Sequence, residues 1–301
     1  MKLSQIGEFG LIDLIAKREH KLSSTHIGIG DDAAVLKAKG KYQLITTDTF
    51  IENVHFTLKR TSFFELGRKV MAANISDIAA MGGYPTHAVV TVGLPKRLSV
   101  DQVRQLYNGI DSLARKYKID IVGGDTVASP KAVVISITLL GEVEKERLLT
   151  RSGAKPGDLI LATGAFGGPA AKKFDNRKLK IENRLNEARL ISKSRRATSM
   201  IDSSDGLVRS VLELCKASRT GARIYEDLVP IAKGASLKQA LFGGEEYELV
   251  FTAPKKNLPK LKKLAKLSVV GEMVPHKFGV GLVDSYGRIK PPKSGGYEHF
   301  K

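Results

Sequence analysis

Seven aspartates of this 301-residue chain lie in short segments flanked by glycine, serine or threonine: Asp31, Asp32, Asp48, Asp77, Asp125, Asp202 and Asp205. The chain is otherwise strongly basic, with a formal net charge of +18, so acid concentrated at such breaks stands out. Carboxylate oxygens with no matching Cys or His spacing suit Mg²⁺, and Mg²⁺ in turn suits phosphates. These residues therefore indicate an enzyme that handles nucleotides through several metal ions.

Each of these segments also has a simpler interpretation. A single Gly-Asp pair is more often a turn or a helix cap than a metal site, and only the repetition of the pattern favours a site. The chain has no Gly-x-x-x-x-Gly-Lys-Ser/Thr loop and no protein-kinase motif set. Gly28-Ile29-Gly30 lacks the third glycine of a dinucleotide fingerprint. Any phosphoryl transfer must therefore use a different scaffold.

Alternating helices and strands are expected to position the aspartates. Hydrophobic periodicity predicts, in the first half, helices over 6–18, 63–81 and 99–117 and strands over 42–46, 88–92, 119–122 and 132–143. Asn74 and Asp77 are three residues apart on the second helix, so both side chains lie on one of its faces. Asp48 follows one strand and Asp125 another, with glycines nearby that give room for a phosphate.

The second half opens at the turn-rich segment 151–158, and the domain boundary is expected near residue 147. The clearest strands predicted after it are 159–163, 267–273 and 280–283. Mixed elements in both halves predict an α+β protein of two domains, residues 1–147 and 148–301.

Composition limits the class of protein. No stretch approaches the roughly 18 apolar residues of a membrane span, and the N-terminus does not have the form of a signal peptide. The single cysteine, Cys215, excludes an intramolecular disulfide and is expected to be a small buried residue. A cytoplasmic location is the default expectation. The positive charge suits either nucleic acid or small anionic substrates. In 255–266 leucines recur every three residues between the lysines, which favours a solvated helix face.

Longer motifs are recognisable as a set. In order and spacing they resemble the thiamine-monophosphate kinases over nearly the whole chain, from Gly7–Phe9 to Gly296–Phe300. The segments that carry the resemblance are Gly28–Ala34, Thr46–Thr49, Asn53–Phe56, Asn74–Gly82, Gly123–Thr126, Thr150–Asp158, Ser204–Leu207, Gly243–Leu249 and Gly296–Phe300. Several are shared with the wider superfamily of aminoimidazole ribonucleotide synthetase-like ATP enzymes. Asn53–Phe56 and Gly243–Leu249 favour the kinase.

The resemblance implies a two-domain PurM-like fold, in which a sheet of the N-terminal α/β domain forms a homodimer and a C-terminal α/β domain completes the site. It implies Mg²⁺-dependent transfer of the ATP γ-phosphoryl group to thiamine monophosphate, giving thiamine diphosphate and ADP. The implied Mg²⁺ ligands are Asp32, Thr46, Thr47, Asp48, Asp77, Asp125, Asp202 and Asp205, with Asp48, Asp77, Asp125 and Asp205 as catalytic residues. Gly124, Asp125, Arg151 and Ser204 would contact ATP, and His55, Glu245 and Tyr297 would contact thiamine phosphate.

Other functions remain as alternatives. His55 could be a structural histidine, and Tyr297 could cap the core. Aminoimidazole ribonucleotide synthetase, another ATP enzyme of the superfamily, also uses a phosphate ester. A basic nucleic-acid-binding protein with structural aspartates is disfavoured, because carboxylates facing phosphates without metal would repel them. The basic segment Lys172–Arg196 matches no motif of the family.

Overall fold

Two β-sheets, one from each half of the chain, are joined by a hydrophobic core that both halves share. The computed structural model describes residues 2–18, 22–175, 183–293 and 295–300. The first half contains α1 (Leu3–Ala16), β1 (Thr25–Ile27), β2 (Ala34–Lys37), β3 (Lys41–Ile51), α2 (Phe63–Ala80), β4 (Tyr84–Leu94), α3 (Val100–Tyr117), β5 (Asp120–Ala128) and β6 (Val134–Glu144). The second contains β7 (Asp158–Thr163), α4 (Gly168–Ala171), α5 (Leu185–Ser194), β8 (Ser199–Asp202), α6 (Leu207–Ser218), β9 (Thr220–Tyr225), α7 (Leu237–Phe242), β10 (Leu249–Pro254), α8 (Leu258–Leu261), β11 (Leu267–Pro275), β12 (Val280–Val283) and β13 (Ile289–Lys290).

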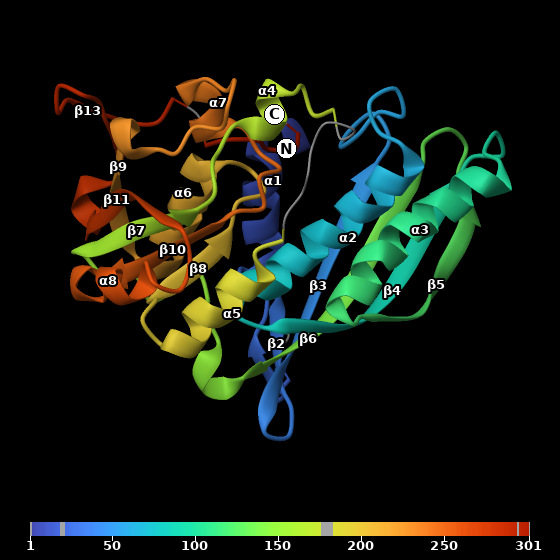
Figure 1. Cartoon of the computed structure of the whole chain (residues 1–301), viewed down its shortest axis with the longest axis horizontal. Coiled ribbons are helices and arrows are strands. Elements are labelled where there is room, and N and C mark those ends of the chain that lie inside the picture. Colours follow the sequence, from blue (N-terminus) through green and yellow to red (C-terminus); the bar gives the residue numbers. More distant parts are fainter. Residues whose placement is uncertain (1, 19–21, 176–182, 294, 301) are drawn as a thin grey trace.

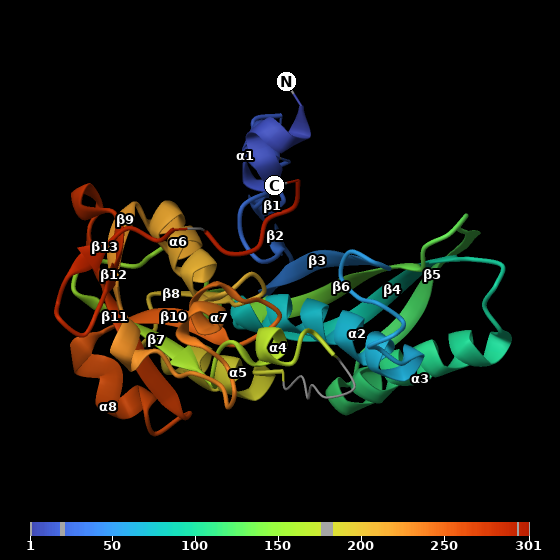
Figure 2. The same ribbon diagram turned by 90° about the horizontal axis from the view of Figure 1, so that it is seen from above.

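The first sheet has six strands in the order β1-β2-β3-β6-β4-β5. Helices α2 and α3 cover one face of it (Figures 1 and 2). Each begins with a capping box, Ser62 with Glu65 and Ser99 with Gln102, which satisfies backbone N–H groups at the helix start. The α2 helix is buried along most of its length, so it fixes the side chains that it presents to the second half.

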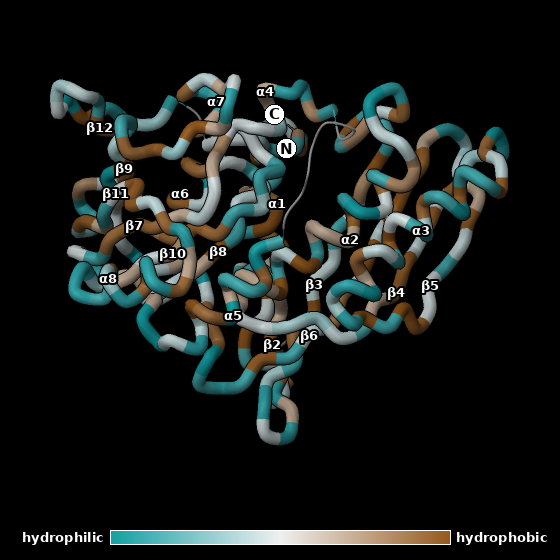
Figure 3. Tube along the Cα trace, viewed as in Figure 1, coloured by the Kyte–Doolittle hydropathy of each residue, from teal (hydrophilic) through white to brown (hydrophobic). Residues whose placement is uncertain are grey.

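The second sheet has seven strands in the order β13-β12-β9-β11-β7-β10-β8. Its strands β7, β8 and β10 are almost wholly buried, and hydrophobic segments run along strands in both halves in Figure 3. Leu161, Tyr247 and Phe251 from this half pack in the same core cluster as α2. A second cluster lies around α6 and includes Cys215, whose expected burial is confirmed.

The predicted α+β class is confirmed, and the strongly periodic elements occur where they were expected. Strands β3 and β5 are longer than predicted, however, so Asp48 and Asp125 lie within strands and not after them. Helix α1 also differs from the expectation. It begins earlier than predicted, and it is kinked at Gly7, whose φ of +67° is not helical. Leu14 and Ile15, which the periodicity would place on the apolar side of this helix, are largely exposed. Figure 2 shows α1 projecting from the two sheets. The domain boundary near residue 147 stays a prediction.

Strand β5 lies at the edge of the first sheet and is exposed along nearly its whole length, including Val122 and Val127. Figure 2 shows α2 and α3 on one side of β4, β5 and β6, with no described helix over the other side. Exposed edge strands usually require a cover, because their free N–H and C=O groups can pair with another chain. Within the described ranges, no helix is long and apolar enough to cross a membrane.

Candidate active site

Three of the predicted metal ligands meet where the two halves join. Asp32 lies just before β2, Asp77 is in the last turn of α2, and Asp202 ends β8. One carboxylate oxygen from each lies within 4.8 Å of the other two. Thr46 Oγ1 donates to Asp77 Oδ2 at 2.5 Å, and Ser76 Oγ donates to Asp202 Oδ2 at 2.7 Å. The structure therefore brings together side chains that are up to 170 residues apart in the sequence.

Asp48 and Asp205 lie at the same site, on the wall of the adjoining pocket. Burial, and then repulsion from Asp205 and Asp32, raises the pKa of Asp48 to about 6. Burial, and then repulsion from Glu8, raises the pKa of Asp205 to about 6. The carboxylates thus resist ionisation together, as expected for like charges crowded in a poorly solvated site.

The same two causes act within the three-carboxylate cluster. Burial followed by repulsion from Asp32 raises the pKa of Asp202 to about 8, although the hydrogen bond from Ser76 opposes this. The pKa of Asp77 is also raised well above its ordinary value, by burial and then by repulsion from Asp48 and Asp202. A bound cation would remove this cost, because it supplies the missing positive charge.

Arg151 is the basic group that enters this cluster. Its Nε and Nη2 donate to Asp32 Oδ1 at 3.0 and 2.5 Å, and its backbone N–H donates to both oxygens of Asp31 at 3.2 Å. The pKa of Asp32 is nevertheless raised, because burial outweighs the attraction of Arg151. The predicted contact between Arg151 and ATP stays a prediction.

Alternation along β3 separates its three predicted ligands. Thr46 and Asp48 point toward α2 and the cluster, whereas Thr47 points to the opposite face, where its Oγ1 accepts from Thr138 at 3.2 Å. The side chain of Thr47 therefore points away from the cluster, and its predicted role as a Mg²⁺ ligand stays a prediction.

Asp125 and Gly124 are not part of the cluster within one protomer. Two strands separate β5 from β3, so at about 4.8 Å per strand Asp125 lies roughly 14 Å from the β3 backbone. Its register partners across the sheet are Thr91, Ser136 and Thr49, which places it on the face away from Asp48. The fold itself requires glycine at position 124, since a Cβ there would lie 1.8 Å from the Val90 carbonyl oxygen.

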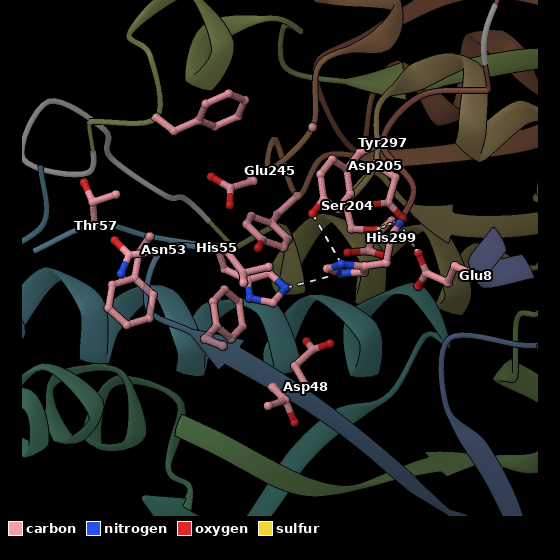
Figure 4. A pocket seen from close by; sticks show the side chains of 18 of the residues that line it. Glu8, Asp48, Asn53, His55, Thr57, Ser204, Asp205, Glu245, Tyr297 and His299 are labelled. Atoms are coloured by element: carbon pink, nitrogen blue, oxygen red, sulfur yellow. Dashed lines mark hydrogen bonds between the residues drawn. The ribbon is translucent and has the colours of Figure 1, made fainter. Parts of the chain in front are cut away.

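A cavity of about 470 Å³ opens beside the carboxylates. Asp48, Asp77, Asp202 and Asp205 line it, and so do all three predicted thiamine-phosphate residues, His55, Glu245 and Tyr297. Figure 4 shows Asp205 and Ser204 beside Tyr297. The aromatic lining is completed by Phe50, Phe56, Phe174 and Tyr247. One cavity therefore combines carboxylates with aromatic side chains.

His55, His299 and Tyr297 form a hydrogen-bonded chain across this cavity (Figure 4). Burial, then the proximity of His299 and Lys69, lowers the pKa of His55 to about 4, so it is neutral at pH 7. Its Nδ1 accepts from the Ile51 N–H at 3.0 Å, so the proton is on Nε2, which faces His299 Nε2 at 3.3 Å. When His299 Nε2 accepts that proton, the ring proton of His299 is on Nδ1, 3.3 Å from the Tyr297 hydroxyl. The Tyr297 proton is left to donate elsewhere.

Sequence reasoning missed four residues of the site: Glu8, Lys69, Ser76 and His299. Glu8 Oε2 accepts from the His299 N–H at 3.0 Å, which ties the N-terminal helix to the C-terminal segment. Glu8 and His299 belong to the terminal segments of the family resemblance. The sequence therefore indicated these two residues but assigned them no function. Lys69 lies in an ordinary helical pattern and carried no signal.

The donor set fits Mg²⁺. The ligands are hard carboxylate and hydroxyl oxygens, and Asp32 Oδ2 is buried with no hydrogen-bond partner among the described residues. Arg151 supplies one positive charge against several carboxylates. Asp32, Asp48, Asp77, Asp202 and Asp205 are therefore the residues that could hold the ions within one protomer.

Comparison with known proteins agrees with this architecture. The family described as AIR synthase related protein matches in its N-terminal domain over residues 30–143 and in its C-terminal domain over residues 155–283. Thiamine-monophosphate kinase of Bacillus subtilis is 35% identical, covering 98% of this chain and 100% of the relative. That of Aquifex aeolicus is 32% identical and covers both chains completely.

A solved structure extends the similarity to the fold. AaThiL complexed with AMPPCP and TMP superimposes with a TM-score of 0.85 at 32% sequence identity, covering 99% of each chain. That protein was therefore captured with an ATP analogue and with TMP. The two-domain PurM-like fold expected from the sequence is confirmed.

Proposed function

This chain belongs to the thiamine-monophosphate kinase family of AIR synthase related proteins, and we propose that it transfers the γ-phosphoryl group of ATP to thiamine monophosphate in the pocket between its two halves. The products are thiamine diphosphate and ADP. The observation that carries the proposal is one cavity in which Asp77 and Asp202 of the carboxylate cluster share the wall with His55, Glu245 and Tyr297. Such a cavity suits a phosphate acceptor whose organic part is cationic and aromatic.

The acceptor oxygen belongs to a phosphate that is already anionic at neutral pH, so the site does not need a strong base to create the nucleophile. The main obstacle is repulsion between two polyanions. Mg²⁺, when bound, would screen that repulsion and stabilise charge on the transferred group. Asp32, Asp48, Asp77, Asp202 and Asp205 would hold the ions, and Arg151 offers a planar donor fork for a phosphate.

The aromatic and polar lining of the cavity also suits the organic part of thiamine phosphate. Neutral His55 does not repel a cationic ring, and Glu245 offers a carboxylate. Burial and the nearby Glu8, Asp205 and Glu245 raise the pKa of Tyr297, so its hydroxyl stays protonated and can donate. Its ring and the ring of Tyr247, which lines the same cavity, offer the π-surface that a cation prefers.

The predicted homodimer would explain the position of Asp125. Strand β5 is an uncovered edge with exposed valines, and its Gly-Asp segment lies away from the protomer's own carboxylates. A second copy packed on this side of the sheet would cover β5 and bring Gly124 and Asp125 to the partner's nucleotide. The predicted Mg²⁺ and ATP contacts of these two residues therefore rest on the dimer. The expected cytoplasmic location stays a prediction.

Complementation between two inactive variants tests the shared site. Asp48→Asn and Asp125→Asn carry different tags, are co-expressed, and the heterodimer is purified through both tags. If each site combines Asp48 of one protomer with Asp125 of the other, the heterodimer keeps one intact site of two and regains about half of the wild-type turnover. A heterodimer as inactive as either parent would contradict the shared site.

A further inference from the structure

Lys69 is a buried lysine beside the pocket that the proposed reaction has not used. It lies on α2, and its side chain is 1% exposed. Its Nζ donates to Glu245 Oε1 at 2.5 Å and to the His55 carbonyl oxygen at 3.1 Å, and it lies 5.6 Å from the centroid of the Phe50 ring. One ammonium group thus joins helix α2, the turn after β3 and the loop before β10, which all contribute to the pocket.

Glu245 is held in an unusual conformation by these contacts. Its φ of +67° lies in the left-handed region, which costs a non-glycine residue of order 1 kcal/mol or more. Its backbone N–H donates to the Ser204 carbonyl at 2.6 Å, which anchors the loop next to Asp205. Such strain persists only where the surroundings enforce it, and Lys69 is the charged group that fixes the side chain.

The two oxygens of Glu245 differ in their surroundings. Oε1 is used by Lys69, whereas Oε2 is buried and has no hydrogen-bond partner in the part of the chain that the structure describes. A buried carboxylate oxygen without a donor is costly, so a ligand that supplies one gains that energy. Because Lys69 already balances the charge of Glu245, the unmet need is a hydrogen-bond donor and not another point charge.

We propose that Lys69 is a positioning residue that orients Glu245 so that its Oε2 accepts a hydrogen bond from an N–H group of the substrate. This inference rests on the proposed function. The amino group on the pyrimidine ring of thiamine phosphate is a donor of this class. The His55 carbonyl and the Phe50 ring fix the ammonium group, and the ammonium group fixes the carboxylate.

Steady-state kinetics with each substrate varied in turn test this role in the full-length protein. Lys69→Met keeps the apolar stem and removes the ammonium. It is expected to raise the KM for thiamine phosphate about tenfold or more, as for a lost hydrogen bond to a charged group, and to leave the KM for ATP unchanged. Lys116→Met, a change at an exposed lysine of α3, is the matched control and should alter neither KM. An unchanged or lower KM for thiamine phosphate in Lys69→Met would overturn the inference.

A second comparison does not depend on the folding of Lys69→Met, which leaves a carboxylate without its counter-charge. The single variant Glu245→Gln and the double variant Lys69→Met with Glu245→Gln both lack the carboxylate of Glu245, so neither contains an unpaired buried carboxylate at this position. If Lys69 acts through Glu245, both have the same raised KM for thiamine phosphate. A further rise in the double variant would overturn the inference. Wild-type protein that does not bind thiamine phosphate would instead overturn the proposed function, and this inference with it.

Discussion

Replacing Asp48 by asparagine should make the metal-free protein more stable while it removes activity. The folded protein holds the pKa of Asp48 at about 6, above the ordinary 3.8, through burial and repulsion from Asp205 and Asp32. A group whose folded pKa is raised favours folding at low pH, and that benefit is lost as the pH rises through about 6. At pH 8 the ionised carboxylate therefore costs the folded state an upper bound of about 3 kcal/mol.

Asparagine has nearly the same shape and no charge, so Asp48→Asn should recover up to about 3 kcal/mol at pH 8 and progressively less toward pH 4. The assay is urea unfolding of EDTA-treated wild type and variant at several pH values between 4 and 8. The control is Asp227→Asn, a change at an exposed aspartate, which should shift the stability little at any pH.

A metal ligand differs from a structural aspartate in these two assays, because its replacement by asparagine raises the stability of the metal-free protein but lowers turnover. With Mg²⁺ and both substrates, Asp48→Asn should lose turnover by at least about a hundredfold. A variant no more stable than wild type at pH 8 without metal would refute the electrostatic reasoning. Wild-type turnover at saturating Mg²⁺ would refute the ligand role of Asp48.

Three further predictions follow from the same geometry. Mg²⁺ and protons compete for the raised-pKa carboxylates, so Mg²⁺ should raise the melting temperature more at pH 8 than at pH 5.5; an equal rise at both values would count against the site. Glu245→Ala should raise the KM for thiamine phosphate while leaving ATP binding measured by calorimetry intact, and an unchanged KM would refute its assignment. Gly206→Ala should destabilise the fold by about 2 kcal/mol or more in urea unfolding, because the φ there is +99° and a Cβ would lie 2.1 Å from the Gly243 carbonyl oxygen; wild-type stability would show that the loop can move.

Most of the fold follows from local patterns in the sequence. The long helices α2 and α3 and the strands β6 and β7 carry strong periodicity and end at clear signals, so their positions were predictable. The position of helix α1 was also predicted, but its exposure was not, because its apolar residues satisfy the same periodicity without packing on a sheet. Gly7 allows a kink that periodicity does not reveal.

The sequence predicted many residues of the site, but it did not predict which side chains pair with one another. Recurring Gly- and Ser-flanked aspartates identified Asp32, Asp77 and Asp202, which the fold brings within 4.8 Å. The pairing of Arg151 with Asp32 and of Lys69 with Glu245 depends on side chains that meet only after both halves pack. Single-chain reasoning also gave no sign that Asp125 would lie on the opposite face of the sheet from Asp48.

Part of the basic charge has a structural use that the sequence did not reveal. Arg184 donates to both oxygens of Glu248, at 2.6 and 2.7 Å, and Arg189 Nη2 to both oxygens of Glu144 at 2.9 Å. The lysines of 255–266 are exposed around the buried Leu261, in agreement with a solvated face, but the α-helix itself spans only Leu258–Leu261 of the expected run. The basic residues at 177–180 lie outside the described residues.

ADP release with and without thiamine monophosphate, in Mg²⁺ and again after chelation, tests the central claim most directly. We predict ADP formation that requires both thiamine monophosphate and Mg²⁺, with thiamine diphosphate appearing in equal amount. ADP formation that persists after exhaustive chelation would contradict the carboxylate-held metal site. Turnover with formylglycinamidine ribonucleotide in place of thiamine monophosphate would contradict the proposed substrate.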